Sequence, residues 1–199
     1  MWLASVDGEI TPAGEARIPV ADEGLLRGDG GFEVVRVYGG VPYAWDEHLA
    51  RLGRTCDGLR LELDADAVRT EAEALLGAAG EPESLLRLVV TRGGRRIAIV
   101  EPLPERGTTA RVATITYAPT RVLNGLKTLS YAGNMLAVRL AREQGYDEAL
   151  FVTPHGRVIE SRMPSESGVV HSRPAATQKN DHVGPSSTRP WGLTSSASS

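Results

Sequence analysis

The stretch FEVVRVYGGVPYA, residues 32 to 44, alternates apolar and polar side chains and is interrupted at Gly39 and Gly40. An alternation with a period of two is that of a β-strand with one face against a core. Paired glycines tolerate the positive φ angles of a tight turn, so the stretch predicts a β-hairpin. The chain is therefore expected to contain an antiparallel sheet.

Two helices and three further strands are predicted after this hairpin. In residues 45 to 59 the apolar side chains recur on one helical face, and Asp64 can cap a second helix. Both helices suit the role of covers for a sheet. The strands are apolar, are bounded by Gly and Pro, and fall at 85–94, 95–102 and 110–119. Residues 1–117 are therefore predicted to form one N-terminal α+β domain.

The next part of the chain predicts the start of a second domain, residues 126–162, after an irregular connection at 118–125. A helix is expected from Ser130 to Gln144, because its apolar residues have helical spacing and Gly145 provides a stop. The segment EALFVTPHGRVIE, residues 148 to 160, predicts a second hairpin.

The composition changes after residue 160. Residues 161–199 hold ten serines, whereas residues 1–160 hold three. Such a segment buries too little apolar surface to offset the roughly 1 to 2 kcal/mol per residue that backbone ordering costs. We expect residues 163–199 to be a disordered tail, and we interpret the change as a frameshift or truncation in the gene or its record.

Composition and charge argue against several classes of protein. The net charge is -3 and the arginines are scattered among acids, which disfavours binding to nucleic acid. The first residues lack the pattern of a leader, and no apolar stretch reaches the roughly 20 residues that span a bilayer. Cys56 has no partner for an internal disulfide, and the four histidines show no metal-ligand spacing. We therefore expect a soluble, cytoplasmic protein with no metal, no nucleic-acid partner and no membrane contact.

Lysine is rare in this chain. Of the 22 lysines and arginines, only Lys127 and Lys179 are lysines. Arginine supplies a permanent charge, whereas lysine supplies an amine that can lose its proton and attack a carbonyl. Codon usage alone could also leave a single lysine among many arginines, so the neighbouring residues decide whether Lys127 is functional.

Four segments, in order, resemble the class IV, fold type IV aminotransferases, which use pyridoxal 5'-phosphate. They are RGDGGFEVVRVYGG, HLARL, LKTLSYAGNMLAVRLAREQGYDEALFV and GRVIE, at 27–40, 48–52, 126–152 and 156–160. The resemblance implies an α+β, two-domain fold type IV enzyme with an incomplete second domain. It also implies a homodimer whose active sites lie between the domains and borrow residues from the neighbouring subunit.

The resemblance assigns roles to individual residues. Lys127 would form a Schiff base with the cofactor aldehyde and shuttle a proton at the substrate α-carbon. Glu160 would face the pyridine nitrogen, and Arg51 would hold the phosphate with two donors. Tyr131 would hydrogen-bond the ring oxygen, although it could equally pack. His48 is expected to hold its helix rather than to act in catalysis.

The resemblance also places a substrate-facing row on one strand. Phe32, Val34 and Arg36 alternate along that strand and therefore share one face. The GDG sequence at 28–30 resembles the D-amino acid aminotransferase and aminodeoxychorismate lyase branches. The R-x-H pair that follows TRG in the former branch is absent, since Arg96-Ile97-Ala98 stands there.

Three functions remain open from the sequence. The first is a class IV aminotransferase that moves an amino group between an amino acid and a 2-oxo acid. The second is an aminodeoxychorismate lyase, which eliminates pyruvate in folate synthesis with the same lysine and cofactor. The third is an inactive remnant of such an enzyme, because the segment after Glu160 loses the pattern that contributes to the phosphate site in relatives.

Overall fold

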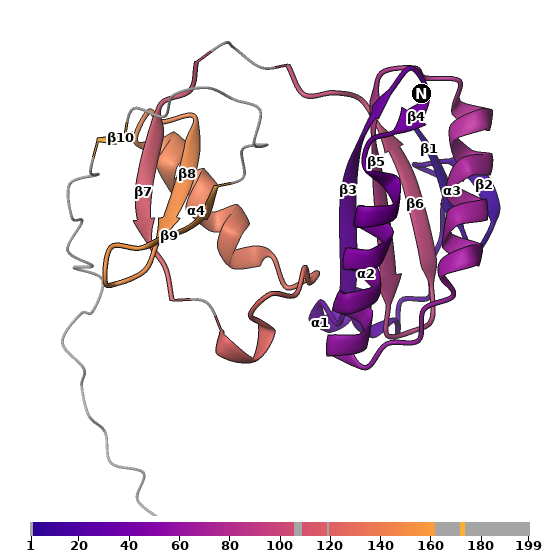
Figure 1. Ribbon diagram of the computed structural model, residues 1–199, viewed down its shortest axis with the longest axis horizontal. Helices are drawn as coiled ribbons and strands as arrows, with labels where there is room; N and C mark the ends of the chain where they lie inside the picture. The colour runs from indigo at the N-terminus through magenta and orange to yellow at the C-terminus, as the bar shows by residue number, and fades with distance from the viewer. Residues whose placement is uncertain (1, 106–108, 119, 162–171, 174–199) are drawn as a thin grey trace, which may run out of the picture.

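The computed structural model describes residues 2–105, 109–118, 120–161 and 172–173. These residues form two α+β units, each with its own sheet (Figure 1). The first sheet has the strand order β2-β1-β6-β5-β3-β4 and is antiparallel throughout. Its strands are β1 (Leu3–Val6), β2 (Glu9–Pro12), β3 (Gly30–Tyr38), β4 (Val41–Pro42), β5 (Ser84–Thr91) and β6 (Arg96–Glu101).

The predicted hairpin and its two covering helices are confirmed. Gly39 and Gly40 adopt φ angles of 54° and 80° between β3 and β4, conformations that favour glycine. Helix α2 spans Trp45–Leu59, and helix α3 spans Ala65–Ala79. The side chain of Asp64 accepts a hydrogen bond from the backbone N–H of Ala67, which caps α3 as predicted.

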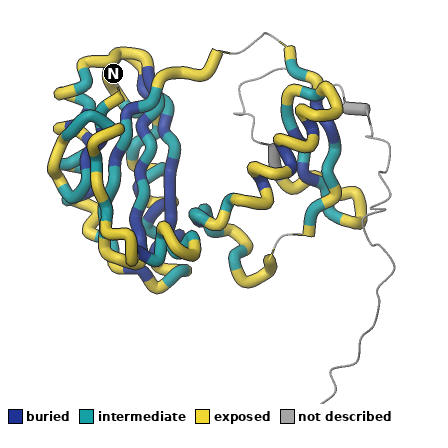
Figure 2. The backbone as a smooth tube through the Cα atoms, turned by 180° about the vertical axis from the view of Figure 1, so that it is seen from behind, coloured by how far each residue is buried: buried dark blue, intermediate teal, exposed yellow. Residues whose placement is uncertain are grey.

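One face of the first sheet is covered by α2 and α3, and the core lies between them. Val35 and Val37 of β3 are fully buried on this face, as are the middle residues of β5. The buried strands of this unit stand out as dark segments in Figure 2. The alternate residues Val34 and Arg36 belong to the opposite face and are only half-buried, because no helix of the described chain covers that face.

The second sheet has the order β10-β7-β8-β9. Its strands are β7 (Val112–Thr116), β8 (Glu148–Val152), β9 (Val158–Ser161) and β10 (Ser172–Arg173). Helix α4 (Ala132–Glu143) connects β7 to β8, which pair in parallel. This helix and the hairpin of β8 and β9 agree with the prediction.

The placement of β7 corrects the predicted domain boundary. The segment was expected to belong to the N-terminal domain of residues 1–117, but it pairs with β8 in the second sheet. Its parallel partner follows it only after α4, as parallel pairing requires a crossover. The strand's own residues carry no mark of which sheet it joins, so sequence order alone misplaced it.

Besides β10, four elements were not predicted, namely β1, β2, the short helix α1 (Glu23–Arg27) and a single 3-10 turn at Arg121–Leu123. The expected tail lies largely outside the described residues. Within it, Ser172–Arg173 pair in parallel with the start of β7, which the prediction of a wholly disordered segment did not include.

Candidate active site

Lys127 lies on a short segment that pairs with the beginning of β3. The backbone N–H of Phe32 donates to the carbonyl of Lys127 at 3.0 Å, and the N–H of Leu129 donates to the carbonyl of Gly30 at 2.9 Å. Gly31 and Thr128 form the bridge between them. Residues that face each other across paired strands project to the same side, so Lys127 and Phe32 share one face.

Small residues on β3 and α2 make room for this segment. A Cβ atom on Gly30 would lie 2.5 Å from Cδ1 of Leu129, and one on Gly58 would lie 2.6 Å from Cδ2 of Leu126. The hydroxyl of Thr55, on α2, accepts a hydrogen bond from the backbone N–H of Lys127 at 3.2 Å. The first unit therefore fixes the backbone of Lys127, although the lysine precedes α4 of the second unit.

The Lys127 amine lies over an aromatic ring. Its Nζ atom is 4.5 Å from the centre of the Phe32 ring, a cation–π distance. The ring of Tyr131 meets the same ring edge to face, with centres 5.5 Å apart. The structure thus brings together three of the predicted site residues, Lys127, Tyr131 and Phe32.

Arg51 reaches the other face of β3, where it pairs with a buried carboxylate. Its Nε and Nη2 atoms donate to the two oxygens of Glu33, each at 2.6 Å. The Nδ1 atom of His48 lies 2.9 Å from the same carboxylate, whose side chain is fully buried. Burial raises the pKa of Glu33, but the hydrogen bonds from Arg51 and His48 outweigh it and hold the pKa below its ordinary value.

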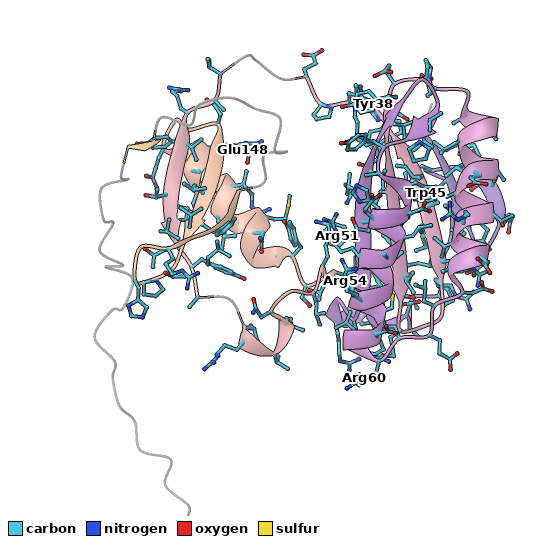
Figure 3. All side chains as sticks on the ribbon, in the orientation of Figure 1. Tyr38, Trp45, Arg51, Arg54, Arg60 and Glu148 are labelled. Carbon is cyan, nitrogen blue, oxygen red and sulfur yellow. The ribbon has the colours of Figure 1, made fainter. Side chains whose placement is uncertain are left out.

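This pairing changes how Arg51 can bind a phosphate. The predicted grip used two donors, but Nε and one Nη2 hydrogen are directed at Glu33. Among the described residues no protein acceptor is found for Nη1, and the side chain is 46% exposed. Figure 3 shows Arg51 and Arg54 on the side of α2 that faces the segment leading into α4. Arg51 is therefore held in place by Glu33, beside His48, and has Nη1 available for a ligand.

Of the remaining predicted site residues, Arg36 and Val34 lie farther along β3, and Glu160 lies on β9. Arg36 is four residues along β3 from Phe32 and forms an ion pair with Glu83 near the Gly39 turn. Val34 lies between them on the same face. Glu160 belongs to β9, opposite Phe151 in the sheet, and its side chain lies outside the described part of the chain. The structure thus does not bring Arg36 to Lys127.

Sequence reasoning missed three residues of this site. Glu33 was read only as a polar residue of a predicted strand. It lies two residues before Val35 and therefore faces the helices, where a buried carboxylate needs hydrogen-bonding partners. Thr55 and Gly58 follow Arg51 on α2 and carry no individual signal. Their roles depend on where the Lys127 segment docks, which only the folded chain shows.

Within the described residues, no group of three or more His, Cys, Asp and Glu side chains could hold a metal ion. In the same part of the chain, no helix is both long enough and apolar enough to cross a membrane.

Comparison with known proteins gives relatives of one kind. The bifunctional aminodeoxychorismate lyase / D-amino acid transaminase of Mycobacterium tuberculosis is 32% identical over 181 residues, which are 79% of this chain and 63% of the relative. The D-alanine aminotransferase of Bacillus licheniformis is 25% identical over 193 residues, 86% of this chain and 68% of the relative. Among solved structures, the 4-amino-4-deoxychorismate lyase of Pseudomonas aeruginosa superposes with a TM-score of 0.69 at 33% identity.

That superposition covers 80% of this chain and 64% of the lyase chain. The fold is therefore the two-domain α+β fold of these enzymes, with the second domain represented in part. The class IV amino-transferase profile matches residues 30–163, from β3 to just past β9. This match spans the docked lysine segment, α2 and both sheets, and the chain belongs to the class IV aminotransferase family.

Proposed function

We propose that this chain is a pyridoxal-phosphate-dependent aminotransferase, which moves an amino group between an amino acid and a 2-oxo acid. The observation that carries the proposal is the position of Lys127, whose backbone is fixed by β3 and Thr55 and whose amine lies over Phe32. The chain spans less than two thirds of the length of the Mycobacterium tuberculosis relative, so the activity is proposed for the site rather than transferred from it.

The residues present fit this cofactor by their chemistry. Lys127 offers a primary amine, and Arg51 offers the one guanidinium nitrogen that does not bind Glu33, Nη1. Bound pyridoxal phosphate supplies an aldehyde that bonds to amines and a ring that withdraws electrons from the substrate α-carbon. Lys127 would hold the aldehyde carbon and later carry a proton to and from the substrate α-carbon. Arg51 would hold the phosphate through Nη1.

Two further residues complete the proposed site. Tyr131, which packs edge to face on Phe32, is proposed to hydrogen-bond the ring oxygen of the cofactor. Glu160, on β9, is proposed for the pyridine nitrogen because the segment GRVIE resembles the strand that ends in the family's cofactor glutamate. Phe32 and Val34 would face the substrate, since they share the Lys127 side of β3.

The aminodeoxychorismate lyase reaction is the second candidate. It is favoured by the 32% identity to a relative whose name carries both activities and by the 33% identity to a solved lyase. The two candidates use the same lysine, so product analysis separates them. Release of pyruvate without a new amino acid would indicate the lyase.

Purified protein with pyridoxal phosphate, reduced with borohydride and digested, tests the site directly. We expect a cofactor adduct on the peptide that carries Lys127 and a visible absorbance band before reduction. Lys127→Arg should lose both, whereas Lys179→Arg, the matched control for the chain's other lysine, should keep both. Absence of the adduct in folded protein would overturn the proposed function.

The assembly and location are also proposals. We infer a homodimer, because the family's sites lie between domains and subunits, and analytical ultracentrifugation of the holo-protein would measure it. A monomer that carries the Lys127 adduct would contradict the dimer and leave the lysine assignment intact. A cytoplasmic location is checked by cell fractionation.

A further inference from the structure

Three polar side chains meet where α2 packs on β3. The Nδ1 atom of His48 lies 2.9 Å from Oε2 of Glu33 and 3.2 Å from Nη2 of Arg51. The same Nη2 atom lies 2.6 Å from Oε2 of Glu33. Each of the three side chains therefore contacts the other two.

The two contacts of His48 exclude each other as hydrogen bonds. A ring nitrogen of histidine either carries a hydrogen and donates or has a lone pair and accepts. A guanidinium nitrogen only donates, so a hydrogen bond with Arg51 needs a lone pair on Nδ1. An ionised carboxylate only accepts, so a hydrogen bond with Glu33 needs a hydrogen on the same atom.

The burial of Glu33 favours the second arrangement. Hydrogen bonds hold the pKa of Glu33 below its ordinary value, so its carboxyl group is ionised at neutral pH. Its side chain is fully buried, whereas that of Arg51 is 46% exposed. A donor of Arg51 that loses its partner can bind water, but a buried carboxylate oxygen that loses one carries the larger penalty. The hydrogen on Nδ1 of His48 therefore goes to Glu33.

This arrangement leaves more of Arg51 available for a ligand. The Nη2 atom carries two hydrogens, and one of them is directed at Glu33. The second would be bound by His48 only if Nδ1 had a lone pair. With a hydrogen on Nδ1, the second Nη2 hydrogen and Nη1 form the outer edge of the guanidinium, and two such donors match a phosphate group.

We propose that His48 is a positioning residue for the phosphate subsite, because its Nδ1 hydrogen binds Glu33 and leaves both outer donors of Arg51 for a phosphate group. The inference rests on the proposed function, in which Arg51 holds the phosphate of the cofactor. The tautomer of His48 then determines whether the phosphate meets one donor of Arg51 or two.

The test compares two aldehydes that differ only in the phosphate, namely pyridoxal phosphate and pyridoxal. Each is titrated into the full chain, and the absorbance band gives an apparent dissociation constant. His48→Phe keeps a ring but removes Nδ1, so the Arg51 guanidinium is drawn further toward Glu33. We expect the constant for pyridoxal phosphate to rise about tenfold or more, as loss of one charge-assisted hydrogen bond predicts, with no change for pyridoxal.

Two further variants separate the donor from the ring. His48→Asn should keep the wild-type ratio of the two constants, because its amide nitrogen can donate to Glu33 from near the position of Nδ1. His155→Asn is the matched control, since His155 is an exposed residue of the turn between β8 and β9, and it should change neither constant.

Nitrogen-15 NMR of the histidine rings reads the tautomer of the wild-type protein without a ligand. The His48 signal is the one that is absent from His48→Asn, and we expect it to show a hydrogen on Nδ1 at neutral pH. A lone pair on Nδ1 would overturn the proposal. Equal weakening of both aldehydes in His48→Phe would show a purely structural role and overturn it too, as would unchanged constants. A wild-type chain that forms no Lys127 adduct would overturn the proposed function, and this inference with it, through a different readout.

Discussion

The two units differ in how their cores are built. In the first unit, large side chains of α2 and α3, such as Leu52 and Leu75, pack against the valines and leucines of the sheet. In the second, the buried cluster around α4 contains four alanines, one valine and Phe151, the one large side chain in it among the described residues. Stabilisation by burial follows apolar area, so the first unit carries most of it.

This difference explains where Lys127 is attached. Lys127 precedes α4 by only a few residues, yet its hydrogen bonds and packing are made with β3 and α2. A nucleophile needs a rigid support to meet its target in a productive geometry. The better-packed unit provides this support through β3 and Thr55.

The largest effects should come from the two cores. Leu52→Ala should cost about 2 to 5 kcal/mol of unfolding free energy, and Phe151→Ala about 3 to 5, since both side chains are fully buried. Cys56, the only cysteine of the chain, reports the first unit alone. Burial, with a contribution from Asp57, raises the pKa of its thiol to about 11, so it reacts with thiol reagents only when this unit opens.

Thiol labelling of Cys56 in mild denaturant separates the units. Leu52→Ala should accelerate labelling strongly, whereas Phe151→Ala should leave the rate unchanged while far-UV circular dichroism records the loss of the second unit. If both substitutions accelerate Cys56 labelling equally, the two units open together and do not differ in stability as proposed.

Removal of Arg51 should rank next. Arg51→Met keeps most of the length of the side chain but removes its charge. Among the described residues, the buried Glu33 carboxylate then keeps His48 as its one side-chain partner. We expect a loss of about 3 kcal/mol at neutral pH, the low end for a broken buried pair, because the exposed half of Arg51 lets water approach. Urea unfolding of this variant measures the loss.

The double variant Arg51→Met with Glu33→Gln provides the control. With the charge gone from position 33, the second substitution should restore part of the stability. If the double variant is as unstable as the sum of the two single variants, the pair is not coupled and the arrangement of Arg51 is set by other contacts.

A smaller effect is expected at the contact between α2 and the lysine segment. Thr55→Val preserves the shape of the side chain and removes the acceptor for the Lys127 N–H, a loss of about 1 to 3 kcal/mol where the donor stays unsatisfied. Hydrogen exchange of the Lys127 amide should become faster, and Thr55→Ser should restore its protection. Unchanged exchange in Thr55→Val would show that the pairing with β3 holds the lysine without α2.

The sequence predicted elements that short patterns encode in both units, but not the pairing of strands that are far apart in the chain. The bounds of α2 agree with the prediction because its apolar face is encoded by residues one helical turn apart, and α3 begins where Asp64 caps it. The pairing of β7 with β8 joins residues on either side of α4, so no short pattern specifies it. β1 is a different case, because it forms a local hairpin with β2 around Asp7 and Gly8, and the Asp-Gly turn signal in the sequence was missed.

For the candidate site, the sequence predicted which residue types take part but not which side chains contact one another. The scarcity of lysine and the resemblance to a family indicated Lys127, and the structure placed it beside Phe32 and Tyr131. The partner of Arg51 was not predicted, since a glutamate in a strand gives no sign of which helix it will meet.

The smallest expected effect concerns acid and the Glu33 carboxylate, whose lowered pKa is what remains after burial is offset by Arg51 and His48. A carboxyl whose pKa is lower in the folded state binds protons more readily when unfolded, so acid favours unfolding. Its contribution is complete above the ordinary value of 4.5 and is lost as the pH falls through the folded-state pKa. The difference in unfolding free energy between wild type and Glu33→Gln should shrink as the pH falls below about 4.5. A difference that grows below pH 4.5 would mean that the folded protein holds Glu33 protonated. Burial would then outweigh the hydrogen bonds from Arg51 and His48, and Arg51 would be held by a neutral carboxyl group instead of an ion pair.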